Sequence, residues 1–261
     1  ESWEKLNIMF STSKGTVRRN ALSDFVKIQS SGKIAMKLSD DDKLIGVHTC
    51  EEKEDDVFLS TKEGKCLRFP ISNVRKFSGR NSVGVRGIRL SKEDTVISMY
   101  ILKHAKFTID ERNDYLKIAN AIRRKELRRS MPYKKLSKDT KLPENKFVEM
   151  EKIEEFILSV ADNGYGKRSS AYEYRITSRG GKGIANMAVS KKTGKVVSSF
   201  PITEKDDVML ITGTGKLIRS PVNKIRIAGR TTQGVTLFRV ESSEKVLSAA
   251  SIKDLNISSE E

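Results

Sequence analysis

The chain has 261 residues, and a hydrophobic content of 37% is enough to form the core of one large or two small domains. Its 50 lysines and arginines outnumber 34 acidic residues, giving a net charge of +16 and a sequence pI of about 9.7. This balance favours a polyanionic partner such as nucleic acid, although solvated surface lysines give the same total. Two cysteines and the lack of a long apolar run exclude a disulfide scaffold and a membrane-spanning protein, and favour a reducing cytoplasm.

An apolar strand, a polar turn with glycine and a basic residue four positions later recur four times along the chain. The turn glycines are 49, 100 and 51 residues apart: Gly15, Gly64, Gly164 and Gly215. A second glycine precedes another apolar segment in each copy, at spacings of 52, 99 and 51 residues: Gly32, Gly84, Gly183 and Gly234. Two sets of matching spacings predict a repeat of about 50 residues with one insertion near residues 103–153.

Each copy contains short β-branched and aliphatic runs bounded by turn-forming residues, which predict antiparallel strands. A third strand is expected after a polar turn, at 43–47, 95–99, 195–197 and 245–247. Units of about four short strands are typical of propeller-like arrays. We therefore predict an all-β fold with two repeats in 1–102, two repeats in 154–255 and a short acidic tail at 256–261.

The insertion has a different pattern, because apolar residues recur every three or four positions from Asp110 to Arg129. This period predicts an amphipathic helix that ends at Met131-Pro132, and the inserted segment 103–153 is expected to be largely helical. Residues 103–153 carry 15 basic and 8 acidic side chains. The cluster Arg123, Arg124, Lys125, Arg128 and Arg129 could contact phosphate or could complement the helix dipole.

Basic residues return at the same places in each repeat, which predicts rows of cations along one edge of the array. The first row is Arg19, Arg68, Arg168 and Arg219, flanked by Lys14, Arg18, Lys65, Lys167 and Lys216. The second row is Arg80, Arg86, Arg179, Lys182 and Arg230. Regularly spaced cations suit the phosphates of a bent duplex, so backbone contacts without base readout are expected. The alternative is that these charges only protect exposed strand ends from aggregation.

The sequence contains no recognisable catalytic or metal-binding constellation. His48 and His104 have no partner motif, and no tyrosine lies in a DNA-cleaving context. The glycine-rich segment 178–183 could approach phosphate or form a structural hairpin, but it lacks the P-loop pattern. We therefore expect no catalytic residue, metal or cofactor in this chain.

Three segments carry a resemblance to successive blades of the C-terminal domain of the DNA gyrase A subunit, within the type IIA topoisomerases. They are Gly84-Val85-Arg86-Gly87-Ile88-Arg89-Leu90, Asn163-Gly164-Tyr165-Gly166-Lys167-Arg168 and Gly229-Arg230-Thr231-Thr232-Gln233-Gly234-Val235. The resemblance implies a β-pinwheel that wraps duplex DNA and supports negative supercoiling, usually with six blades. Segment 177–183 is similar to the family's Q-R-R-G-G-K-G box but has Thr177 and Ser178 in place of Gln and Arg. This departure suggests that the box itself lies upstream of Glu1.

The resemblance also implies partners and location. They are double-stranded DNA, the rest of the gyrase A subunit, and the gyrase B subunit, in the bacterial cytoplasm at the nucleoid, with ATP and Mg used only by the complete enzyme. The isolated chain is expected to be a monomer without enzymatic activity. Two alternatives stay open, the related C-terminal domain of topoisomerase IV and a propeller-like platform for protein partners.

Overall fold

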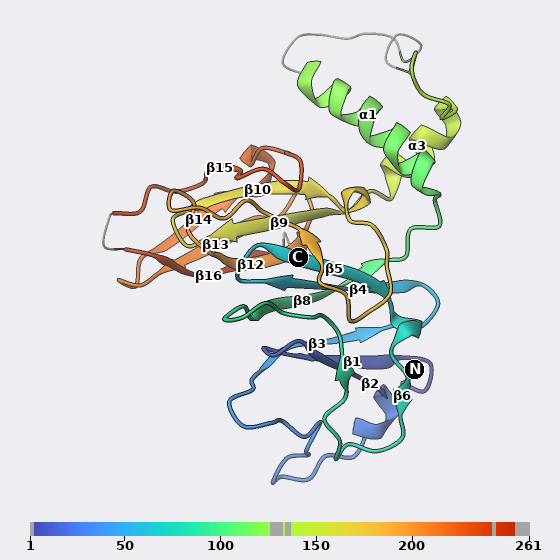
Figure 1. Cartoon of the computed structure of the whole chain (residues 1–261), viewed down its shortest axis with the longest axis vertical. Helices are drawn as coiled ribbons and strands as arrows, with labels where there is room; N and C mark the ends of the chain where they lie inside the picture. The colour runs from blue at the N-terminus through green and yellow to red at the C-terminus, as the bar shows by residue number, and fades with distance from the viewer. Residues whose placement is uncertain (1–2, 126–132, 134–136, 242–243, 254–261) are drawn as a thin grey trace, which may run out of the picture.

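The computed structural model describes residues 3–125, 133, 137–241 and 244–253. Four small sheets follow one another through the molecule, and two helices project from them at the top of Figure 1. The predicted all-β array is confirmed. None of the helices in this described part has the length and apolar character that a membrane crossing requires.

Every repeat is built on an inner, a middle and an outer strand, paired antiparallel in that order. The inner strands of successive repeats lie beside one another. In inner, middle, outer order, the strands are β3 (Leu44–Cys50), β1 (Asn7–Thr12) and β2 (Thr16–Ala21) in repeat 1; β8 (Val96–Lys103), β4 (Asp55–Thr61) and β5 (Lys65–Pro70) in repeat 2; β12 (Val196–Ile202), β9 (Phe156–Ala161) and β10 (Tyr165–Ser170) in repeat 3; and β16 (Val246–Ile252), β13 (Asp207–Thr212) and β14 (Leu217–Pro221) in repeat 4.

The turn between the middle and outer strands is stabilised by a similar hydrogen bond and a left-handed glycine in the repeats. In repeats 1, 2 and 4 a threonine hydroxyl accepts the backbone N–H four residues later, as Thr61 does from Lys65 at 3.2 Å. The glycine of this turn has φ between +74° and +82° in all four repeats. Because L-residues other than glycine are disfavoured there, the recurring glycine is a conformational requirement.

The second glycine of repeats 2, 3 and 4 opens a two-residue strand that leaves its own sheet. These exchange strands, β7 (Val85–Arg86), β11 (Ile184–Ala185) and β15 (Val235–Thr236), pair with the outer strand of the preceding repeat. The turn-glycine carbonyl of that preceding repeat also accepts two successive N–H groups. Gly164 O, for example, accepts from Leu237 at 2.8 Å and Phe238 at 3.2 Å. Each repeat therefore completes the sheet of the one before it.

The strand predicted after Gly32 does not form, and residues 32–39 are irregular. Its counterparts become strands only by pairing with a preceding repeat, and repeat 1 has no preceding repeat among the described residues. A further parallel contact, between β6 (Lys76–Phe77) and β2, holds repeat 2 against repeat 1.

Apolar packing also crosses repeat boundaries. One cluster joins repeats 1 and 2 through residues such as Met9, Val57 and Phe69, and a second joins repeats 3 and 4. A buried polar cluster lies between repeats 2 and 3, where Asn186 Nδ2 donates to the hydroxyls of Ser60, Ser159 and Ser199 at 3.0–3.3 Å. Because these contacts link the repeats, we treat the array as one folding unit.

The residue directly before the first-row arginine is a fully buried cation in repeats 1 and 3, where the outer strand meets the next repeat. Arg18 donates to the Gly79 carbonyl and, at 2.5 Å, to the Ser82 carbonyl. Lys167 donates to Gly229 O at 2.6 Å, and burial lowers the pKa of its amine to about 7. The corresponding position of repeat 2 is Leu67.

The helical insertion lies between β8 and β9. Helix α1 (Ile109–Lys125) begins with a capping box, in which Thr108 Oγ1 accepts the Glu111 N–H at 3.2 Å and the Glu111 carboxylate accepts the Thr108 N–H at 2.8 Å. The helix end predicted at Met131-Pro132 lies outside the described residues, as does the acidic tail. Helix α3 (Glu144–Lys152) lies in the same segment, for which no second set of helix bounds was predicted.

The insertion is seated on repeat 3 by an aromatic core. Tyr172 follows β10 and is buried against Phe107 and Tyr115, and its hydroxyl donates to Met150 O at 3.0 Å. The matching positions in the other repeats are Ser23, Ser72 and Asn223, all exposed. Tyr172 is therefore the repeat-3 residue specialised for holding the insertion.

We predict that Gly164→Ala destabilises the fold more than Gly215→Ala. Both glycines have left-handed backbones, so each change costs about 1–2 kcal/mol of unfolding free energy. At Gly164 the added methyl group would also overlap the Phe238 carbonyl of repeat 4, whereas at Gly215 no described atom lies within 4 Å. Thermal melting should show a lower Tm for Gly164→Ala. Equal melting temperatures would contradict this view of the inter-repeat contact.

We predict that Lys167→Leu removes a pH-dependent part of the stability. From about pH 7 to about pH 10 the unfolded chain holds a lysine proton that the folded chain lacks, so this residue makes stability rise with pH by at most about 1.4 kcal/mol per unit. The unfolding free energy of the wild type relative to Lys167→Leu should therefore increase across this range. Lys65→Gln, at an exposed neighbouring site, is the control. A difference between wild type and Lys167→Leu that is independent of pH would refute the prediction.

Candidate nucleic-acid interface

The first predicted row of cations is mostly inside the protein. Arg19, Arg68 and Arg168 are 4%, 2% and 5% exposed, and only the repeat-4 member, Arg219, is exposed. The expectation that this row lies open along an edge is wrong for these three residues. The cause is the following repeat, which covers the outer strands β2, β5 and β10.

Arg68 illustrates what the buried members do. Its Nε donates to Asp56 at 2.8 Å, and its terminal nitrogens donate to Ala171 O of repeat 3 at 2.9 Å and Lys103 O at 2.6 Å. Arg168 likewise donates to Ile225 O and Asn223 O of repeat 4 at 2.7 and 3.2 Å. These guanidinium groups hold the backbone of the next repeat.

The residues that flank the first row are exposed or buried according to their position in the repeat. Lys14, Lys65 and Lys216 are exposed at or beside the turns, whereas Arg18 and Lys167 are buried between repeats. Lys14 Nζ donates to Asp40 O at 2.7 Å, and Lys216 pairs with Glu241 and Glu244 at 3.3 and 3.2 Å. The turn lysines therefore reach solvent, and two of the three already have described partners.

The second row is partly exposed, and three of its arginines make the same kind of hydrogen bond to the preceding repeat. One terminal nitrogen of Arg80, Arg179 and Arg230 donates to Ile34 O, Arg86 O and Ala185 O, respectively, at 2.8–2.9 Å. Each acceptor lies two residues after the second glycine of the preceding repeat. These arginines thus link neighbouring repeats while part of each side chain reaches solvent.

Arg86 lies in β7 and Lys182 lies two residues before β11, and both are exposed. Lys182 and Arg179 border a hollow of about 550 Å³ that the glycine-rich segment 178–183 forms against β5. Within this segment the Gly180 N–H donates to Gly87 O at 2.5 Å and Gly181 O accepts the Arg89 N–H at 2.8 Å, so its glycines bond to the backbone of repeat 2. The segment therefore makes a contact between repeats instead of the expected hairpin, because both of its flanks pair with β5.

A third row was missed by the sequence analysis. Arg75, Arg175 and Arg226 are all exposed and each follows a buried residue that ends a short 3-10 helix. Arg75 and Arg175 are 100 residues apart, and Arg175 and Arg226 are 51 residues apart. The turn glycines of repeats 2, 3 and 4 have the same two spacings. This periodicity was the available signal. The residue directly after each of these arginines pairs in parallel with the buried first-row arginine of the preceding repeat. The pairs are Arg19 with Lys76, Arg68 with Ile176 and Arg168 with Ile227.

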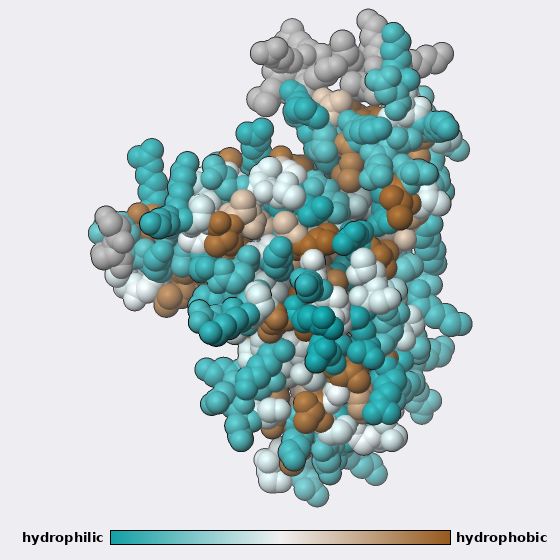
Figure 2. Space-filling view, in the orientation of Figure 1, coloured by the Kyte–Doolittle hydropathy of each residue, from teal (hydrophilic) through white to brown (hydrophobic). Residues whose placement is uncertain are grey.

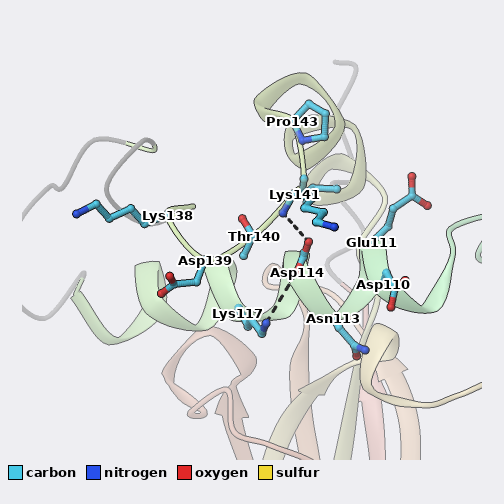
Figure 3. Close-up of a pocket in the computed structure, with 11 residues that line it drawn as sticks. Asp110, Glu111, Asn113, Asp114, Lys117, Lys138, Asp139, Thr140, Lys141 and Pro143 are labelled. Atoms are coloured by element: carbon cyan, nitrogen blue, oxygen red, sulfur yellow. Dashed lines mark hydrogen bonds and ion pairs between the residues drawn. The ribbon is translucent and has the colours of Figure 1, made fainter.

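Hydrophilic side chains cover most of the face in Figure 2, and apolar ones are scattered among them. The insertion contains a separate hollow of about 600 Å³ between α1 and residues 138–143 (Figure 3). Asp114 at its centre accepts the Lys141 N–H at 2.8 Å and faces Lys117 at 3.8 Å. Over the described residues, no group of three or more histidine, cysteine or carboxylate side chains is placed to hold a metal.

Comparison with known proteins identifies the repeats. The family described as "DNA gyrase C-terminal domain, beta-propeller" matches residues 6–51, 55–103, 155–203 and 206–253. The four matches leave the helical insertion unmatched.

Among curated relatives, the DNA gyrase A subunit of Rickettsia bellii (strain RML369-C) is 49% identical over 261 residues, covering 100% of this chain and 29% of the relative. The corresponding Escherichia coli (strain K12) protein is 34% identical over 244 residues, covering 94% of this chain and 22% of the relative. The chain thus spans less than a third of these relatives.

Two solved structures share the fold. A DNA gyrase A C-terminal domain has a TM-score of 0.67 at 20% identity, with 96% of this chain and 67% of that chain covered. A topoisomerase IV C-terminal domain has a TM-score of 0.70 at 18% identity, with 95% and 62% covered. The resemblance drawn from the sequence is confirmed, and the chain belongs to the family of DNA gyrase C-terminal domains.

Proposed function

We propose that this chain binds and bends duplex DNA through its phosphates, as the non-catalytic wrapping domain of a gyrase-type topoisomerase. Its partners would be DNA, the rest of the gyrase A subunit, and the gyrase B subunit, while ATP and Mg would act elsewhere in the complete enzyme. The observation that carries the proposal is the exposed row Arg75, Arg175 and Arg226, which recurs with the repeat. Regular phosphate contacts need regularly placed cations, and do not need base-reading groups.

The buried and exposed arginines have complementary roles in this proposal. Arg68 and Arg168 hold the next repeat by its backbone carbonyls, and that same backbone carries Arg175 and Arg226 one to four residues further on. The buried row thus positions the exposed row. Arg80, Arg179 and Arg230 contribute both an inter-repeat contact and positive charge, and the exposed Lys182 and Arg86 extend the basic surface.

The environments of two tyrosines support a binding role without catalysis. Burial raises the pKa of Tyr172 and of Tyr174, which disfavours either phenolate as a nucleophile. The gyrase A relatives at 34–49% identity favour a gyrase-type assembly over topoisomerase IV, and a supercoiling assay of the complete parent enzyme distinguishes the two.

The combined substitution Arg75→Gln, Arg175→Gln and Arg226→Gln should weaken DNA binding with little effect on Tm. Three lost phosphate contacts should make the slope of log affinity against log salt shallower by about two to three units. Fluorescence anisotropy on two unrelated duplex sequences should show the same loss on both. An unchanged salt slope would exclude this row as the phosphate-binding surface, and a flat response of the wild type would reject DNA binding itself.

Arg68→Gln is the structural control for this experiment. It removes the guanidinium from the buried Asp56 carboxylate, which then keeps only its contact with His104 among the described ion pairs, and this should cost about 3–5 kcal/mol of unfolding free energy. Its Tm should fall well below that of the exposed-row variant. A stable Arg68→Gln protein with weak DNA binding would instead assign the phosphate contact to the first row.

A further inference from the structure

The segment that leaves the inner strand of repeat 2 differs in charge from the matching segments of repeats 1 and 3. These links to the next repeat are residues 51–54 in repeat 1, with three glutamates and one lysine, and residues 203–205 in repeat 3, with one glutamate and one lysine. Residues 103–106, where the insertion begins, contain two lysines, one histidine and no acid. The boundary between repeats 2 and 3 therefore has the most basic of the three links.

The absence of a link acid in repeat 2 goes with a different partner for the first-row arginine. In repeats 1 and 3 a glutamate of the link pairs with that buried arginine at 3.1 Å. In repeat 2 this place is taken by Asp56 of β4, which lies 2.8 Å from Arg68. The link residue His104 pairs with the same carboxylate at 2.7 Å. Because Asp56 supplies the negative charge from inside the sheet, the link of repeat 2 carries a basic surface.

The basic link lines a cleft of about 500 Å³ at the foot of the insertion, where the helices rise from the sheets in Figure 1. The buried rings of Phe107 and Tyr172 form part of its lining. Lys103 and Lys106 of the link border it with side chains that are each 67% exposed. Lys146 of α3 borders it from the insertion, with Nζ 5.0 Å from the centre of the Phe107 ring. Cations of the array and of the insertion thus meet at one cleft.

Three carboxylates also line this cleft, and each has a described partner. Glu155 accepts a backbone N–H of the link at 3.0 Å, a bond that recurs in the other two links and belongs to the fold. Glu54 pairs with Lys106 at 3.0 Å, and Glu149 pairs with Lys146 at 3.6 Å. Ion pairs that reach solvent contribute little to stability, so both lysines can exchange these partners for a stronger acceptor. A phosphate oxygen is such an acceptor.

The cleft adjoins the exposed row of arginines. Arg68 borders both this cleft and the hollow formed by segment 178–183, which Arg175 also lines. Tyr172 in the cleft precedes Arg175 by three residues, so their Cα atoms are at most about 11 Å apart. Phosphates along one strand of a duplex recur about every 3.4 Å of helix axis. A duplex that contacts Arg175 can therefore also reach the cleft.

We propose that the cleft at the foot of the insertion binds phosphates of duplex DNA through Lys106 and Lys146. The inference rests on the proposed function, since it adds a contact to the same bound duplex. Phosphate oxygens would take the places of Glu54 and Glu149 as partners of the two lysines. The links of repeats 1 and 3 lack this basic character and carry no insertion, so the array would hold DNA most strongly at the boundary between repeats 2 and 3.

The test compares two double variants that remove the same charge. Lys106→Gln with Lys146→Gln should weaken duplex binding and make the slope of log affinity against log salt shallower by about two units, because each neutralised phosphate contributes about 0.9. The loss should be equal on two unrelated sequences. Lys53→Gln with Lys205→Gln removes one exposed lysine from each of the other two links and should keep the wild-type slope.

Fluorescence anisotropy gives the affinities, and the Tm of both double variants should stay close to that of the wild type. If the Tm of the Lys106→Gln, Lys146→Gln protein falls, Lys106→Gln alone is the test, with an expected slope change of about one unit. Equal slopes for the two double variants, or a wild-type slope for Lys106→Gln alone, would overturn the inference. A flat salt response of the wild type would instead reject the proposed function, so the two failures are distinct.

Free ATP separates a duplex contact from a nucleotide site. Calorimetric titration of the wild type with ATP should show no binding, because the cleft is inferred to hold phosphates that the duplex presents in a row. ATP binding that disappears in the Lys106→Gln, Lys146→Gln protein would assign the cleft to a nucleotide and overturn its role in holding DNA.

Discussion

The fold depends on one hydrogen-bonding arrangement, in which the carbonyl of a left-handed turn glycine accepts two successive N–H groups from the following repeat. Gly15, Gly64 and Gly164 each do this at 2.7–3.3 Å. Since the acceptor belongs to one repeat and the donors to the next, no repeat completes its sheet alone. This contact occurs at the same repeat boundaries as the exchange strands, the apolar clusters and the buried outer strands.

Packing of each repeat on the next buries some arginines and leaves others exposed, and the sequence does not distinguish the two groups. Arginines that point between repeats bond to carbonyls and carboxylates, as Arg68 and Arg168 do, and are removed from solvent. Arginines on the backbone that follows, such as Arg175 and Arg226, remain exposed. Buried guanidinium groups with satisfied bonds stabilise one geometry, so the spacing of the exposed cations is set by the interior of the array.

Glycine spacing, strand alternation and the helical period were sufficient to predict the repeats, the inner strands and α1. Exposure of the first arginine row was not predictable, because burial there depends on which strand covers the preceding sheet. Nothing in the sequence indicates that β7, β11 and β15 leave their own repeats, since two-residue strands carry no periodicity. The bounds of α3 were not predictable because its buried apolar residues, Phe147 and Met150, span one turn only. The exposed row was predictable from its spacing, which matches that of the glycines.

The central claim is that repeat geometry sets the placement of phosphate contacts on a bent duplex. Hydroxyl-radical footprinting of a long duplex bound by this chain tests it most directly. The account predicts protection that recurs at one regular interval, with successive protected sites corresponding to successive repeats, and that is the same on unrelated sequences. A single short protected stretch, or one fixed to a particular base sequence, would contradict it.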